Sequence, residues 1–164
     1  MTEKVFNVLF LCTSNSGRSL LAEVQLNVLG KGRFRAFSAG SFPAGSVNPF
    51  AIAFLKNAGL PTDGLRSKSW DEFAAPAAPV MDYVLTVCDD AAETQCPVWP
   101  GQPITAHWSV PDPAAVEGDN AQKSQAMVAA AANLRKRIEL LVALPTSSLD
   151  RMGIKASLQK IGTA

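Results

Sequence analysis

The stretch from Cys12 to Ser19 constrains the fold more than any other part of this chain. It follows the apolar run Val8–Leu11 and precedes a helical pattern of apolar residues that begins at Leu20. A short polar loop between a strand and a helix turns its backbone N–H groups inward, and the helix dipole adds to their positive field. We therefore predict an anion-binding loop. The residues expected to bind the oxyanion are Thr13, Ser14, Asn15, Ser16, Gly17, Arg18 and Ser19.

Two residues of this loop carry chemistry that an ordinary turn does not need. Arg18 supplies a planar fork that matches two oxygens of a tetrahedral oxyanion. Cys12 supplies a thiol, and the positive surroundings are expected to lower its pKa and to make it a thiolate nucleophile. The alternative is that Cys12 is a small buried residue in a strand–turn–helix unit that has no special role.

The rest of the chain alternates strand and helix patterns, which predicts a parallel sheet covered on both faces through right-handed crossovers. A capping box of Ser69 and Glu72 is expected to start the short third helix. Asn48 and Pro49 are expected to start the second. The predicted strands cover residues 5–11, 33–38, 83–87 and 104–110, and the predicted helices 20–29, 49–58, 69–73, 120–144 and 147–161.

Length and composition indicate one domain over residues 1–164, since 48% hydrophobic residues supply a proper core. The final segment, residues 145–164, is expected to pack on that domain through an apolar stripe. Its members are Leu149, Met152, Leu158 and Ile161.

The net charge of +1 favours neither nucleic acid nor an anionic membrane as a partner. No apolar run reaches the roughly 20 residues that span a bilayer, so we expect a cytoplasmic protein. In that reducing compartment three cysteines are more often catalytic, redox-active or metal-binding than structural disulfide partners. Zinc ligation is not expected, because paired Cys-x-x-Cys spacing is absent from the sequence.

The stretch at Cys12 resembles the active-site loop of the low-molecular-weight protein tyrosine phosphatase superfamily, in which a cysteine, five residues, an arginine and a serine or threonine follow one another. The resemblance implies a flavodoxin-like three-layer α/β sandwich with a four-stranded parallel sheet in the order 2-1-3-4. The phosphatase-type loop would follow the first strand, where ligands bind at the switch point. Two kinds of relative share this loop, namely phosphatases and one class of arsenate reductases.

The other two cysteines distinguish between these relatives. If the first and third strands are neighbours about 4.8 Å apart, Cys12 and Cys88 emerge at one sheet edge, and a disulfide between them is geometrically reasonable. Cys96 follows in a proline-bounded loop. The block from Cys88 to Asp112-Pro113 resembles the thiol-linked arsenate reductases, which implies a relay. Cys12 attacks arsenate, Cys88 attacks Cys12 and expels arsenite, and Cys96 then forms a disulfide with Cys88.

Asp112 matches the general acid of the family, which would protonate the oxygen that leaves the oxyanion. Taken alone, Asp-Pro is usually a turn. Family phosphatases commonly continue this motif with tyrosines that stack on an aromatic substrate. This chain continues with Ala114-Ala115, and its only tyrosine is Tyr83, within a predicted strand.

The sequence therefore predicts reduction of arsenate to arsenite, with phosphate or sulfate as substrate mimics. No bound cofactor is expected, and the electrons would come from an external thiol, either thioredoxin or glutaredoxin with glutathione. The alternatives are a phosphatase that acts through a Cys12 phosphoenzyme and a non-catalytic oxyanion or redox sensor. The chain departs from the family pattern at Ser14 and Gly17, so the resemblance does not predict how flexible the loop is.

Overall fold

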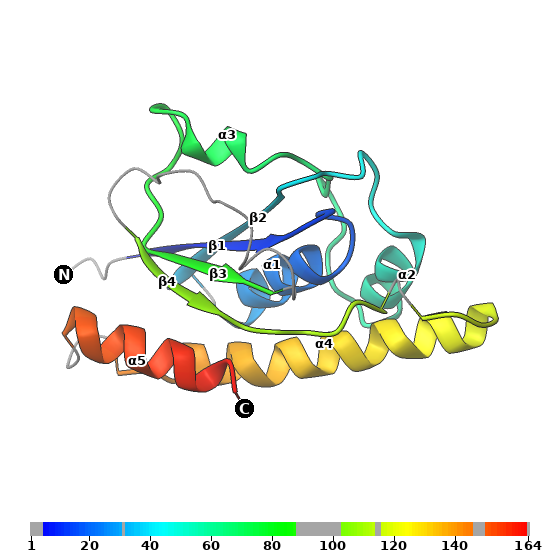
Figure 1. Ribbon diagram of the computed structural model, residues 1–164. Helices are drawn as coiled ribbons and strands as arrows, with labels where there is room; N and C mark the ends of the chain where they lie inside the picture. Colours follow the sequence, from blue (N-terminus) through cyan, green and yellow to red (C-terminus); the bar gives the residue numbers. More distant parts are fainter. Residues whose placement is uncertain (1–4, 31, 88–102, 114–115, 146–149, 164) are drawn as a thin grey trace.

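The computed structural model describes residues 5–30, 32–87, 103–113, 116–145 and 150–163. Its centre is a four-stranded parallel sheet in the order β2-β1-β3-β4, as predicted (Figure 1). The strands are β1 (Phe6–Cys12), β2 (Phe34–Gly40), β3 (Tyr83–Thr86) and β4 (Ile104–His107). All four run in the same direction, so the carboxyl ends of β1 and β3 lie together at one edge.

Helices cover the two faces of the sheet unequally (Figure 1). Alternate residues of β1 point to opposite faces, and Val8, Phe10 and Cys12 pack in the larger core beneath α1, α4 and α5. Leu9 and Leu11 pack in a smaller core beside α3. The helices are α1 (Arg18–Leu29), α2 (Pro49–Asn57), α3 (Asp71–Ala74), α4 (Asn120–Val142) and α5 (Arg151–Ile161).

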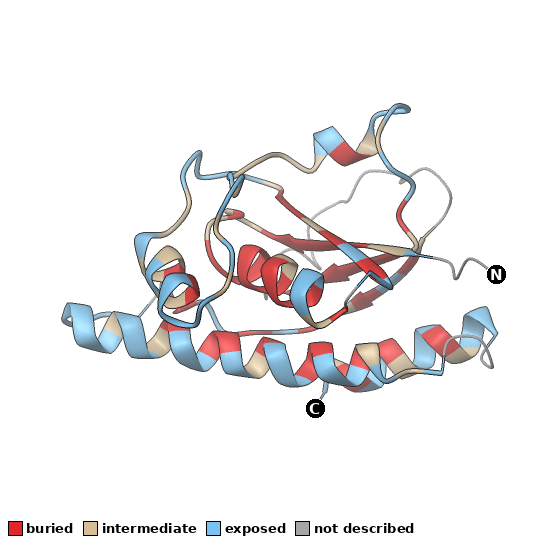
Figure 2. Cartoon of the chain, turned by 180° about the vertical axis from the view of Figure 1, so that it is seen from behind, coloured by how far each residue is buried: buried red, intermediate tan, exposed pale blue. Residues whose placement is uncertain are grey.

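The starts of two helices follow the sequence signals. Asn48 caps α2 by accepting from the backbone N–H of Phe50 at 2.8 Å, and Pro49 is the first helical residue. One face of α4 is buried, and Figure 2 shows its exposed face turned away from the sheet. The buried apolar residues of this face are Met127, Ala130, Ala131, Leu134, Ile138 and Leu141. Within the described ranges, no helix is both long enough and apolar enough to cross a membrane.

The predicted capping box at Ser69 and Glu72 is wrong. The Ser69 hydroxyl does accept from the backbone N–H of Asp71 at 3.1 Å, but Trp70 is the N-cap residue of α3 and its side chain makes no capping bond. The Glu72 carboxylate instead pairs with both terminal nitrogens of Arg66. A strong, charge-assisted bidentate partner thus takes the carboxylate that the box requires.

The fourth strand is shorter than predicted, because regular pairing ends at His107. After that residue the chain stays close to the sheet, and the backbone N–H of Trp108 donates to the Thr86 carbonyl at 2.6 Å. The buried Trp108 ring also donates through Nε1 to the Leu158 carbonyl at 2.9 Å, which holds α5 against β4.

The register of α5 differs from the prediction. Met152 is 81% exposed, whereas Ile154, Leu158 and Ile161 are buried. These three residues have the i, i+4, i+7 spacing of one helix face. Met152 does not belong to this face, so the predicted stripe is wrong at that residue. Leu149 lies outside the described residues.

Candidate active site

The loop after β1 turns its backbone carbonyls away from the thiol, toward the segment 42–48. The carbonyls of Thr13, Ser14 and Ser16 accept backbone N–H groups at 2.8, 2.9 and 2.8 Å. A trans peptide places the following N–H opposite its carbonyl, so the next N–H groups face the other side of the loop. One of them, from Asn15, reaches Cys12 Sγ at 3.2 Å. The loop therefore presents N–H donors to the space around the Cys12 thiol. The donors to the three carbonyls are Phe42, Ala44 and Asn48.

Cys12 is the last residue of β1, and its thiol is buried. Besides the Asn15 N–H, its sulfur contacts Ser19 Oγ at 2.9 Å. Burial raises the pKa of Cys12, although the hydrogen bonds with Ser19 and the charge of Arg18 act to lower it. The expectation of a lowered pKa is therefore wrong for this structure, because removing a thiolate from water costs more than these neighbours return.

Asn15 holds the loop in shape, a role that the sequence analysis did not assign. Its φ of +47° is left-handed, and it is the only non-glycine residue of the described chain with a positive φ. Asparagine tolerates that conformation better than most residues. Its side-chain Nδ2 donates to Ser19 Oγ at 2.7 Å, and its Oδ1 accepts the backbone N–H of Lys68 at 2.9 Å. The fully buried amide thus fixes the hydroxyl that contacts Cys12.

Arg18 joins the loop after β1 to the loop after β4. Its Nη1 donates to the Val110 carbonyl at 2.8 Å, and its Nη2 lies 3.6 Å from Asp112 Oδ2. Arg18 is only 7% exposed, whereas the Asp112 side chain is 46% exposed. The structure thus brings the predicted general acid to the sheet edge that carries Cys12.

Of the remaining predicted site residues, three lie in the described anion-binding loop and two do not belong to the described part of the chain. The hydroxyls of Ser14 and Ser16 lie 2.9 Å apart and contact each other, and Gly17 is the N-cap of α1. Cys88 and Cys96 lie outside the described residues. The described chain reaches Val87, whose N–H donates to the Leu11 carbonyl at 2.8 Å.

Gly40, at the end of β2, is a second feature that the sequence analysis missed. It pairs with Cys12 in the sheet. A Cβ at this position would lie 2.5 Å from the Thr13 carbonyl oxygen and 3.0 Å from the Asn15 nitrogen. Only glycine therefore allows β2 to approach the anion-binding loop this closely.

Replacing Gly40 with alanine is expected to destabilise the protein by about 1–3 kcal/mol, because backbone atoms of the loop must move to accept the methyl group. Urea unfolding of the wild type and the variant measures this loss. The same movement is expected to slow alkylation of Cys12. An unchanged unfolding midpoint would show that the loop accommodates the methyl group without strain.

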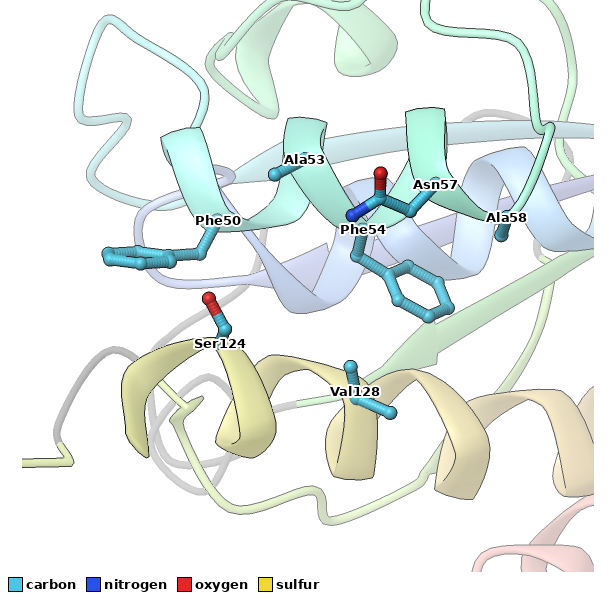
Figure 3. A pocket seen from close by; sticks show the side chains of 7 residues that line it. All are labelled: Phe50, Ala53, Phe54, Asn57, Ala58, Ser124 and Val128. Atoms are coloured by element: carbon cyan, nitrogen blue, oxygen red, sulfur yellow. The ribbon is translucent and has the colours of Figure 1, made fainter. Parts of the chain in front are cut away.

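His107 has a structural partner, since its Nδ1 hydrogen-bonds with Thr86 Oγ1 on the neighbouring strand. Among the described residues, no three His, Cys, Asp or Glu side chains are grouped as metal ligands would be. An open groove between α2 and α4 is separate from the predicted site residues (Figure 3). It is lined by Phe50, Ala53, Phe54, Asn57, Ala58, Ser124 and Val128.

Known proteins are similar to this chain in both sequence and fold. An arsenate reductase of Halalkalibacterium halodurans is 35% identical over 123 residues, which cover 75% of this chain and 84% of the relative. A solved arsenate reductase in an oxidized state is 27% identical, with a TM-score of 0.67 over 84% of this chain and 96% of the other. Another, in a phosphate-binding state, is 26% identical, with a TM-score of 0.64 over 85% and 98%.

The family assignment rests on a match that spans most of the chain. The sequence pattern that describes low molecular weight phosphotyrosine protein phosphatases matches residues 7–151. This range includes all of the sheet except Phe6, the anion-binding loop and the segment that carries Asp112. The chain therefore belongs to the low molecular weight phosphotyrosine protein phosphatase family.

Proposed function

We propose that this protein reduces arsenate to arsenite, with Cys12 as the nucleophile. The observation that carries the proposal is the Cys12 thiol, which lies at the end of β1 within a loop that turns its N–H groups toward it. The relatives named arsenate reductases favour arsenate over other oxyanions of the same shape.

In the first step, Cys12 Sγ attacks the arsenic atom and a hydroxyl group of the arsenate leaves. Asp112 donates the proton that turns this hydroxyl group into water, since its carboxyl lies at the site, 3.6 Å from Arg18. Arg18 and the loop N–H groups stabilise the charge on the remaining oxygens. Since burial raises the pKa of Cys12, the thiol proton must leave as the attack begins, and an oxygen of the bound arsenate is the proposed acceptor.

In the second step, the thiolate of Cys88 attacks Cys12 Sγ and a disulfide forms. The electron pair of the sulfur–arsenic bond stays on arsenic, so As(V) becomes As(III) and arsenite leaves. Cys96 then attacks Cys88, which frees Cys12 and leaves a Cys88–Cys96 disulfide. The backbone hydrogen bond between Val87 and Leu11 supports the attack of Cys88 on Cys12, because each of these residues directly precedes one of the two cysteines.

An external thiol reduces the final disulfide and returns the protein to its starting state. Thioredoxin, or glutaredoxin with glutathione, is the proposed donor. The relay requires three free thiols, which a reducing compartment such as the cytoplasm maintains. Phosphate and sulfate are expected to compete with arsenate for the loop, since they share its tetrahedral shape.

The second candidate is a phosphatase that works through a Cys12 phosphoenzyme, and the family match favours it as an alternative. Aromatic phosphate esters would need a ring partner near the thiol. The only tyrosine of the chain, Tyr83, is buried in β3, where its ring stacks on Phe6. This placement favours arsenate reduction over hydrolysis of phosphotyrosine.

The two candidates are separated by assays on one preparation. Arsenite is measured with arsenate and each thiol donor for the wild type, Cys88→Ser and Cys96→Ser, and hydrolysis of p-nitrophenyl phosphate is measured in parallel. We expect repeated turnover only for the wild type. Repeated turnover by all three proteins would exclude the relay, and fast ester hydrolysis without any arsenite would favour the phosphatase.

A further inference from the structure

A largely buried ion pair lies next to the anion-binding loop, between α1 and the segment that precedes α3. Lys68 Nζ is 3.8 Å from Glu23 Oε1, and the two side chains are 9% and 15% exposed. Charged side chains are rarely buried this far unless they are paired. Neither residue was assigned a role by the sequence or by the proposed reaction.

The Lys68 ammonium group makes two hydrogen bonds in addition to its ion pair with Glu23. It donates to the Ser38 hydroxyl at 3.4 Å and to the Arg66 carbonyl at 3.0 Å. The Ser38 hydroxyl in turn donates to Glu23 Oε1 at 2.9 Å. The lysine side chain is therefore held in one place by α1, β2 and its own segment.

The backbone of Lys68 connects this pair to the thiol. Its N–H donates to Asn15 Oδ1 at 2.9 Å, and its carbonyl accepts from the Gly40 N–H at 2.9 Å. Asn15 in turn contacts the sulfur of Cys12 through its own N–H. A short chain of hydrogen bonds thus runs from the peptide of Lys68 to Cys12.

We propose that Lys68, anchored by Glu23, is a positioning residue for Cys12. Its backbone N–H holds Asn15 in its left-handed conformation, and its ammonium group brings a positive charge to the segment that contacts the loop. The role rests on the proposed function in that Cys12 is taken as the nucleophile. It assigns to this ion pair part of the control over when Cys12 becomes a thiolate.

The electrostatics agree with this geometry. A thiolate at Cys12 raises the pKa of Lys68, so the lysine charge stabilises the thiolate in return. Glu23 also raises the pKa of Lys68, whereas burial and Arg66 lower it. Burial raises the pKa of Glu23, which Lys68 opposes. The remaining charge that acts on Lys68 is that of Glu72, on α3.

These signs give opposite expectations for two variants. Lys68→Met removes the positive charge, so the pKa of Cys12 should rise. Glu23→Gln removes a negative charge and keeps the shape of the side chain, so the pKa of Cys12 should fall. A purely structural pair would not shift the pKa in opposite directions.

The test measures the rate of Cys12 alkylation by iodoacetamide as a function of pH. The chain has three cysteines, so the background Cys88→Ser/Cys96→Ser leaves Cys12 as the only thiol. This background carries one further substitution at a time: Lys68→Met, Lys68→Arg or Glu23→Gln. The matched control is Lys56→Met, because Lys56 is an exposed residue of α2. We expect the alkylation midpoint to rise for Lys68→Met, to fall for Glu23→Gln and to stay unchanged for the control. Lys68→Arg should retain most of the wild-type midpoint.

Equal midpoints for Lys68→Met, Glu23→Gln and the control would overturn the proposal. Thermal unfolding of each variant identifies any that does not fold, and Glu23→Gln, which is isosteric, keeps the test decisive in that case. Alkylation requires no arsenate, so absence of arsenite from the wild type would count against the proposed function alone.

Discussion

Cys12→Ser is expected to reduce arsenite formation by at least about 10³-fold, because a serine hydroxyl at this position is a far weaker nucleophile than a thiolate. Serine also cannot form the disulfide that carries the electrons away from arsenic. The measurement is arsenite formed per minute at saturating arsenate and thiol donor. Loss of the thiol removes both the first attack and the first step of the relay.

The control for this variant is its fold, since serine has nearly the same shape as cysteine and Cys12 lies in the core. The variant should still unfold cooperatively and should still bind phosphate in the loop, because the N–H donors remain. Arsenite formation by Cys12→Ser within tenfold of the wild-type rate would mean that another residue performs the first attack.

Arg18→Lys is expected to lower kcat/KM for arsenate by about 10²-fold. Lysine keeps the charge but loses the planar fork that binds two oxygens at once. It also loses the geometry that links the Val110 carbonyl and the Asp112 carboxylate to one guanidinium. Steady-state kinetics with arsenate as the varied substrate measure the loss.

Arg135→Lys is the matched control, since Arg135 is exposed on α4 and forms its ion pair with Glu139, far along the same helix from its N-terminal end. It should leave kcat/KM unchanged. If Arg18→Lys also retained the wild-type value, the charge alone would be sufficient and the bidentate role of Arg18 would be excluded.

Much of the fold could be predicted from the sequence because local signals agreed with tertiary packing. The apolar run that leads to Cys12 becomes the central strand β1, and Asn48 with Pro49 starts α2 as its residue types require. The strand order came from the family resemblance, since strand patterns do not specify which strands are neighbours. Local signals failed at Ser69 and Met152, where an ion pair and the packing face of α5 decide the outcome.

The candidate site could be predicted only in part. Cys12, Arg18 and Asp112 have recognisable residue types and spacing, and the structure brings the loops that carry them together. The direction of the Cys12 pKa shift could not be predicted, because it depends on how deeply the thiol is buried, and the residue types of the loop do not indicate that depth. Lys68 was also missed, since a lone lysine in a polar segment has no sequence signal for burial beside Glu23.

The most direct test of arsenate reduction by this chain is a single turnover without external thiol. Fully reduced protein is separated from its reductant and mixed with excess arsenate, and arsenite and disulfides are counted together. One two-electron reduction per relay predicts about one arsenite per chain, with Cys88 joined to Cys96 and Cys12 returned as a free thiol. No arsenite, with all three cysteines still reduced, would contradict the proposed reaction.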